Sequence, residues 1–243
     1  MKLIKDNNNY HTSSKKEFEG SNISISSVTK AFEFAYEMAF GLGYHREHRS
    51  GGVINRNKTE IFQNTFQGKI AEIIVYENLK NAGIPVEEPD FSISGKEIWD
   101  DTDLKSNEKS ICIKSAAFFS NLLLLETKDW DNQGRYLPNI NNKEATSTHD
   151  FFVLVRIKPN IKSMLNALPI VKELYLKEIQ SFQWLYDIPG CCSIKTIQHI
   201  INNQYILPQN SNLNKKTKMD AENYYIQTGN LRAIEVLHSS LKE

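Results

Sequence analysis

The residues with the most distinctive chemistry lie between Trp99 and Lys114, in the run Trp-Asp-Asp-Thr-Asp-Leu-Lys-Ser-Asn-Glu-Lys-Ser-Ile-Cys-Ile-Lys. Asp100, Asp101 and Asp103 precede a polar turn, and Lys114 follows it. After the turn, apolar residues alternate with others, which is typical of a half-buried strand. A tight antiparallel return would bring the carboxylate of Asp103 close to the ammonium of Lys114.

A carboxylate beside a lysine is suited to metal-assisted hydrolysis of a phosphodiester. Carboxylate oxygens bind hard divalent cations, of which Mg²⁺ is the usual choice. Such a metal polarises the phosphate and lowers the pKa of a bound water, while the lysine orients that water or offsets developing charge. The structural alternative for the same residues is an exposed hairpin with a surface salt bridge.

The order of these residues resembles the PD-(D/E)XK nuclease family, whose motif is an aspartate, a short hairpin and then acid-x-lysine. Here the last part reads Cys112-Ile113-Lys114, so the acid two residues before the lysine is missing. The resemblance covers about residues 60 to 157. It implies a type II restriction endonuclease that uses Mg²⁺ to make site-specific cuts in double-stranded DNA, acting as a homodimer on a short palindrome.

The resemblance also implies two further acids at the site. Glu72 lies in a segment similar to the first core helix of the family, which often points a glutamate at the metal. Some members that lack the acid recover its charge from a glutamate roughly a dozen residues later, and Glu126 matches that position. The implied catalytic residues are Asp103, Lys114, Glu72 and Glu126, with Asp103, Glu72 and Ile113 as metal ligands. Asp101 and Asp90 are the alternatives to Asp103.

Hydrophobic periodicity predicts the elements that position these residues. Apolar residues indicate an amphipathic helix from Ser27 to Gly41 and a longer helix over 59–82 that is apolar on two sides. Residues 150–157 are almost continuously apolar, which predicts a central strand covered on both faces. Residues 122–126 form either a buried strand or a short helix. The predicted fold class is α/β, with a central mixed β-sheet flanked by helices and a restriction-endonuclease-like core.

We expect one domain over 1–243, with its core at about 59–190. An N-terminal arm and helix occupy 1–58, and polar residues 1–25 are expected to form a loose arm. C-terminal helices and a basic loop occupy 191–243. The candidate DNA-binding residues lie in three loops and are Arg46, Arg49, Trp130, Arg135, Tyr136, Asn139, Lys215, Lys216 and Lys218.

Composition limits the mode of nucleic-acid binding and the cellular location that we expect. The chain has 29 basic and 29 acidic residues, so nucleic-acid binding would rely on local patches rather than on a general positive charge. No apolar run approaches 18 residues, and we expect neither a membrane span nor a signal peptide. Three cysteines form no disulfide or metal framework, which favours the cytoplasm.

Two other functions fit the same residues. The chain could be a DNA-binding module of the same fold that has lost catalysis, which the cysteine at position 112 favours. It could instead be a repair or junction nuclease, which would recognise DNA shape more than sequence. Cleavage of duplex DNA with Mg²⁺, or preference for branched DNA, distinguishes the three functions.

Overall fold

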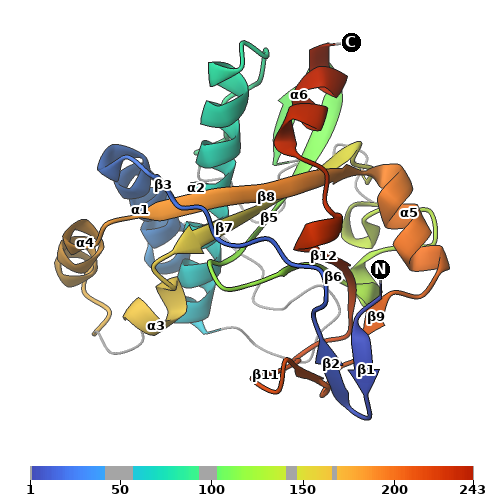
Figure 1. Cartoon of the computed structure of the whole chain (residues 1–243). Helices are drawn as coiled ribbons and strands as arrows, with labels where there is room; N and C mark the ends of the chain where they lie inside the picture. The colour runs from blue at the N-terminus through green and yellow to red at the C-terminus, as the bar shows by residue number, and fades with distance from the viewer. Residues whose placement is uncertain (1, 42–56, 93–102, 141–146, 166–168, 243) are drawn as a thin grey trace.

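The computed structural model describes residues 2–41, 57–92, 103–140, 147–165 and 169–242 (Figure 1). Within these residues the largest sheet has five strands in the order β3-β8-β7-β5-β4. Strands β5 and β7 are parallel, and the other neighbours are antiparallel. The strands are β3 (Ser21–Asn22), β4 (Leu104–Ser106), β5 (Lys109–Ala117), β7 (Phe151–Lys158) and β8 (Leu185–Ser193). The predicted α/β class with a central mixed sheet is therefore confirmed.

Two long helices begin at side-chain caps, as the periodicity predicts. Helix α1 (Ile25–Phe40) begins at Ser24, whose hydroxyl accepts a hydrogen bond from the backbone N–H of Ser27. Helix α2 (Lys58–Asn81) begins with a capping box between Asn57 and Glu60. It ends before Gly83, whose φ of +71° is strained for residues with a side chain.

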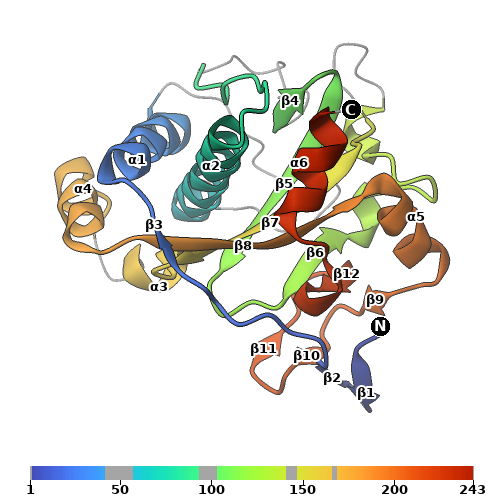
Figure 2. The same ribbon diagram turned by 45° about the horizontal axis from the view of Figure 1, so that its top comes forward.

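The central sheet is buried on both faces by different partners. Ile111 and Ile113 of β5 belong to a core with α1 and α2. Cys112, between them, belongs to a second core on the opposite face. Figure 2 shows α1 and α2 side by side on one side of β5, β7 and β8. Strand β7 is buried at six consecutive positions, in agreement with the predicted central strand.

A smaller sheet and one helix cover the second face. Strand β12 (Asn223–Gln227) lies between β6 (Leu122–Glu126) and β9 (Ile206–Leu207). Helix α5 (Ile194–Asn202) packs its isoleucines into the same core. The segment 122–126, which the sequence left open, is thus a strand. Short 3-10 turns, η1 (Thr127–Asp129) and η2 (Leu137–Asn139), follow β6.

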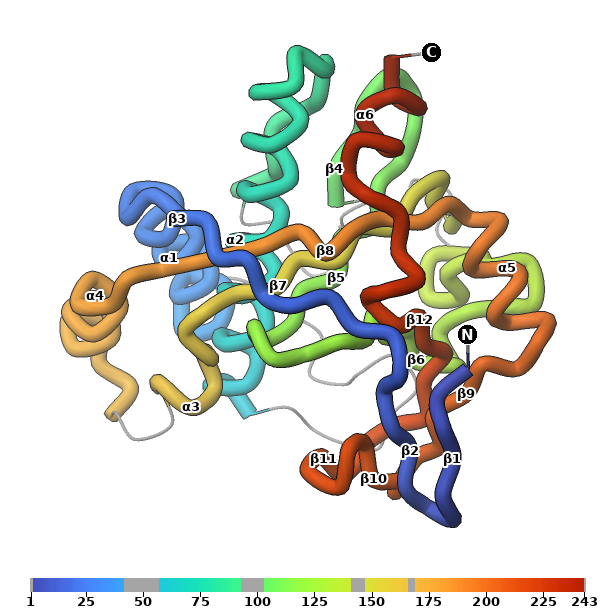
Figure 3. Tube along the Cα trace, in the orientation of Figure 1, coloured from blue at the N-terminus to red at the C-terminus, as the bar shows by residue number. Residues whose placement is uncertain are grey.

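The N-terminal residues are anchored to the C-terminal part of the chain. Strands β1 (Ile4–Asp6) and β2 (Asn9–His11) form one sheet with β10 (Asn212–Leu213) and β11 (Thr217–Lys218), as the trace in Figure 3 shows. The backbone N–H groups of Ser13 and Ser14 donate to the side chain of Gln227. The expectation of a loose arm was therefore wrong for the described residues 2–25.

The remaining elements complete the edges. They are α3 (Ile161–Leu165), α4 (Lys172–Ser181), η3 (Thr228–Asn230) and α6 (Ile234–Lys242). Helix α6 lies beside the β4–β5 hairpin, where the Asn107 side chain donates a hydrogen bond to the carbonyl of Leu241. In the part of the chain that the structure describes, no helix has the length and apolar character needed to cross a membrane.

Candidate active site

The β4–β5 hairpin brings Asp103 to the same strand that carries Lys114. Leu104 pairs with Ile111, so the register continues with Asp103 opposite Cys112. The Oδ2 atom of Asp103 accepts a hydrogen bond of 2.5 Å from the backbone N–H of Ile113. The side chain thus takes the place of the next backbone carbonyl in the ladder. The predicted hairpin is present, and the Asp103 carboxylate acts electrostatically on Lys114 of β5.

Two neighbouring groups on this strand, Lys114 and Cys112, differ in charge state at neutral pH. Burial opposes the charge of Lys114, but the Cys112 sulfur, the Asp103 carboxylate and the Tyr136 hydroxyl together raise the pKa of Lys114. Burial raises the pKa of the Cys112 thiol to about 12. At neutral pH the site therefore holds an ammonium and a neutral thiol beside the carboxylate.

A cavity of about 260 Å³ opens beside Lys114. Its polar lining includes three carboxylates, from Glu126, Asp129 and Asp220, and its aromatic lining comes from Trp130 and Tyr136. One ammonium therefore faces three carboxylates. A phosphodiester would enter this lining favourably only if a cation offset the excess negative charge.

Glu126, predicted as the substitute acid, does reach this cavity. It is the last residue of β6 and forms an ion pair of 3.1 Å with Lys128. Asp129 and Asp220 were not predicted. Asp129 follows Glu126 closely in a polar turn, and this sequence context could have predicted it as a site residue. Asp220 belongs to the C-terminal segment, and nothing in its local sequence predicts that it lies at the cavity.

Glu72 lies on the other side of the sheet. Its carboxylate forms an ion pair of 2.5 Å with Lys69, which is 3% exposed. Lys69 also donates to the backbone carbonyl of Asp90 at 2.8 Å. Helix α2 packs on the face of Ile113, opposite to the face of Cys112. The described contacts of Glu72 belong to the helix layer, and its predicted role as a metal ligand beside Asp103 stays a prediction.

Of the two alternatives to Asp103, the structure describes Asp90 but not Asp101. The Asp90 carboxylate accepts hydrogen bonds from the backbone N–H and the hydroxyl of Ser92. The backbone N–H lowers the pKa of Asp90, and its carbonyl faces Lys69 rather than Lys114. Asp101 lies outside the described residues, as do Arg46 and Arg49.

The predicted DNA-binding residues are dispersed. Trp130 and Asn139 are each only 5% exposed, and Trp130 packs on Phe152. Both side chains therefore pack in the interior and are not positioned to contact DNA bases. Arg135 forms an ion pair of 2.6 Å with Asp131. Tyr136 lines the cavity, and the exposed lysines of the β10–β11 region are Lys215, Lys216 and Lys218.

The oxygen donors near Lys114 decide which metal the site could hold. Mg²⁺ usually keeps several waters and is bound through one or two carboxylates. Glu126 in the cavity lining could supply one of these, and Asp103, which accepts the backbone N–H of the predicted ligand Ile113, is the predicted second. The neutral Cys112 thiol is unsuited to a hard cation. Among the described residues no group of three or more His, Cys, Asp or Glu side chains is arranged to hold a metal ion.

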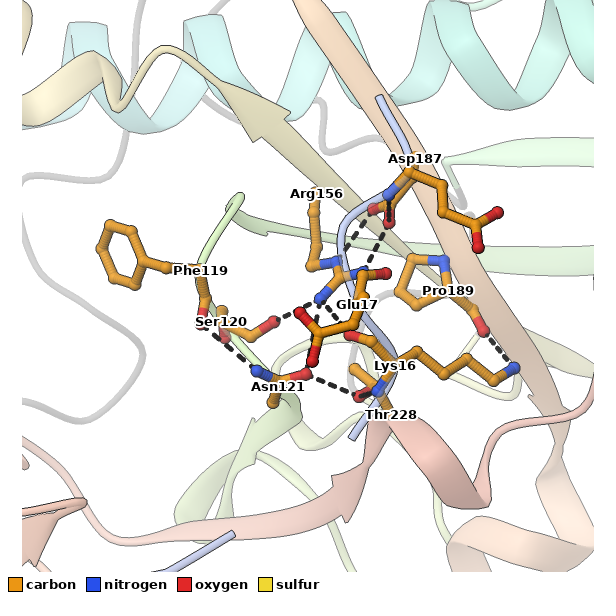
Figure 4. Close-up of polar contacts among 10 residues, drawn as sticks. Lys16, Glu17, Phe119, Ser120, Asn121, Arg156, Asp187, Pro189 and Thr228 are labelled. Atoms are coloured by element: carbon orange, nitrogen blue, oxygen red, sulfur yellow. Dashed lines mark hydrogen bonds and ion pairs between the residues drawn. The ribbon is translucent and has the colours of Figure 1, made fainter. Parts of the chain in front are cut away.

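A buried ion pair lies on the same face of the sheet as Cys112. Arg156 is 1% exposed, and its guanidinium binds both carboxylate oxygens of Asp187, at 2.8 and 2.5 Å. Figure 4 shows the same group donating to the backbone carbonyls of Lys16, Glu17 and Ser120. Every guanidinium nitrogen has an acceptor, so Arg156 ties the N-terminal segment to the sheet.

In comparisons with known proteins, no family model, curated protein or solved structure matches the chain.

Proposed function

We propose that this protein is a Mg²⁺-dependent endonuclease of the PD-(D/E)XK type, cutting double-stranded DNA at specific sites as a type II restriction enzyme. The observation that carries the proposal is the Asp103–Lys114 pair on the β4–β5 hairpin, beside a cavity with further carboxylates. The charged lysine and the oxygen donors are the residue types that phosphodiester hydrolysis requires.

The order of elements gives separate support. A long helix, α2, precedes an antiparallel hairpin, and the second hairpin strand is parallel to the next long strand, β7. This is the order of helix, hairpin and strand on which the family resemblance rests. Because fold alone does not imply function, the charges at the cavity have the greater weight.

The roles of the residues follow from their charges. Lys114, held protonated, would stabilise negative charge that develops on the phosphate, and it could orient a water through its three donors. Asp103 and Glu126 would hold the cation, and Mg²⁺ bound there would supply phosphate polarisation and a water of lowered pKa. Exposed Lys215, Lys216 and Lys218 would contact backbone phosphates next to Asp220 at the cavity.

A restriction enzyme of this size would act as a homodimer, because two-fold protein symmetry matches a palindromic site. We place it in the cytoplasm, where its three free, buried cysteines are compatible with a reducing environment. Size-exclusion chromatography with light scattering tests the dimer, with and without duplex DNA.

The deciding experiment incubates the purified protein with long duplex DNA, with and without Mg²⁺, and sizes the fragments. We expect discrete bands only with Mg²⁺. Lys114→Ala should be inactive, and Lys109→Ala, which removes an exposed lysine of the same strand, should cut normally. Absence of cutting despite DNA binding would leave an inactive binding module. Preference for branched over plain duplex would identify a repair or junction nuclease.

A further inference from the structure

The side chain of Lys114 lies over the indole ring of Trp130. The Nζ atom of Lys114 is 5.9 Å from the centroid of this ring, and both residues line the cavity of the candidate active site. A lysine within about 6 Å of a ring centroid is attracted by the negative potential over the ring face, and tryptophan attracts it most strongly. The contact therefore joins Lys114 of β5 to the loop that follows β6.

The Trp130 ring is held in place by other rings. Its centroid is 5.4 Å from that of Phe152 on β7, 5.2 Å from that of Tyr136 and 6.0 Å from that of His149. Only 5% of Trp130 is exposed. A side chain that is packed in this way has little freedom to change its rotamer. The ring thus presents a fixed surface to Lys114, which is half-buried.

The backbone on either side of the ring is closed into a turn. Trp130 and Tyr136 form an isolated β-bridge, and the chain reverses between them. The Asp131 carboxylate accepts the backbone N–H groups of Gln133 and Arg135, and it also pairs with the Arg135 guanidinium. These contacts fix the turn that carries the ring, so the position of Trp130 is determined by both its backbone and its side-chain packing.

We propose that Trp130 is a positioning residue, whose indole face holds the Lys114 side chain at the cavity. This inference deepens the proposed nuclease function and rests on it for the effect on cleavage. A lysine ends in a flexible four-carbon stem, and a half-buried one has several rotamers open to it unless a neighbour selects among them. Trp130 is itself in the interior, so it acts on the reaction through Lys114 alone.

Trp184 offers a matched control in the core on the opposite face of the sheet. It is also buried, at 2% exposed, and its ring packs edge-to-face on Phe66 of α2. Replacing it by leucine removes the same atoms from a packed interior as the same change at Trp130. The control variant therefore reports the effect of lost packing while the contact between Trp130 and Lys114 stays in place.

The test records the NMR shifts of the Lys114 ε-methylene group in protein labelled on lysine, with Lys114→Ala identifying its signal. Nuclei over the face of an aromatic ring are shifted upfield by the ring current. We therefore expect the Lys114 signal to lie upfield of those of exposed lysines in the wild type. It should join them in Trp130→Leu, remain partly upfield in Trp130→Phe and stay unchanged in Trp184→Leu.

Cleavage assays measure the consequence for the reaction. We expect Trp130→Leu to lower kcat about tenfold with KM unchanged, as for the loss of one partly desolvated contact between a cation and a ring. Trp130→Phe should recover part of kcat, because it retains a ring. Trp184→Leu should cut at the wild-type rate.

The NMR shifts and the cleavage rates can each overturn the proposal. A wild-type Lys114 signal among those of exposed lysines would exclude the contact, as would equal changes in Trp130→Leu and Trp184→Leu. If Trp130→Leu does not fold, Trp130→Phe replaces it, and an unchanged Lys114 shift with this smaller ring excludes the contact. Wild-type kcat in Trp130→Leu would refute the positioning role. If the wild-type protein cuts no DNA, the nuclease proposal fails while the NMR shifts still judge the contact.

Discussion

Two pairs of oppositely charged side chains lie on one face of the central sheet, and they differ in what surrounds them. The Arg156–Asp187 pair is enclosed, and its guanidinium also donates to several backbone carbonyls. Asp103 and Lys114 interact electrostatically beside each other on the hairpin, and Lys114 lines a cavity. A closed pair with all donors used serves the fold. A pair that faces a cavity remains able to act on another molecule.

The closed pair should give the largest loss of stability when it is broken. Arg156→Ala leaves Asp187 buried without its cation and frees the carbonyls of Lys16 and Glu17, which should cost about 3–5 kcal/mol in the free energy of unfolding. Urea denaturation followed by circular dichroism measures this. An unchanged midpoint would mean that the N-terminal segment does not depend on Arg156.

The open pair should give the largest loss of activity. Asp103→Asn keeps an oxygen that accepts the Ile113 N–H but removes the charge, and we expect cleavage to fall at least about 10²-fold. Asp150→Asn is the matched control, because the Asp150 carboxylate accepts the N–H of Ser110 on the same strand. Single-turnover cleavage rates compare them. Equal losses in both variants would assign Asp103 a structural role.

A substitution of Lys114 by arginine tests whether the site needs the compact ammonium of a lysine or only a positive charge. Lys114→Arg keeps a positive charge at a half-buried position but replaces a compact donor with a larger planar one. We expect it to be as inactive as Lys114→Ala, with DNA affinity within about threefold of wild type since only one contact changes. Fluorescence anisotropy with labelled duplex measures the affinity. Activity near wild type would reduce Lys114 to a general positive charge.

Much of the central fold could be predicted from local sequence. The periodicity of residues 25–40 and 58–81, and the apolar run at 151–158, specify α1, α2 and β7 because each buries a face or is buried throughout. Strand β8 was missed, since Pro189 and Gly190 interrupt it. The positive φ of Gly190 and its close approach to Arg232 explain the glycine.

The N-terminal segment shows why the rest could not be predicted. Its backbone amides are bound by side chains such as Gln227 and Asn214, which lie at the other end of the chain. Nothing in the local sequence reports such partners. The same limit explains Glu72: helical periodicity indicates which side of α2 is buried, but not which face of the sheet α2 covers. The pairing of Asp103 with Lys114 was predictable because a hairpin is local.

The smallest expected effects separate the two remaining acids. Glu126 lines the cavity with Lys114, so Glu126→Gln should lower cleavage about tenfold, as for a residue that supports a metal. Glu72 instead partners the buried Lys69 on the helix side of the sheet. Glu72→Gln should leave the cleavage rate unchanged and lower the free energy of unfolding by about 1–3 kcal/mol, because the buried ammonium loses its charged partner.

Measuring both quantities for both variants decides the assignment. Cleavage rates at saturating Mg²⁺ and at a series of lower concentrations show whether Glu126→Gln weakens metal binding, and urea denaturation gives the stability of each variant. The pattern we expect is activity loss in one variant and stability loss in the other. If Glu72→Gln lost activity at full stability, α2 would have to contribute to the site across the sheet edge. If Glu126→Gln cut normally, Asp129 or Asp220 would be the second carboxylate at the cavity.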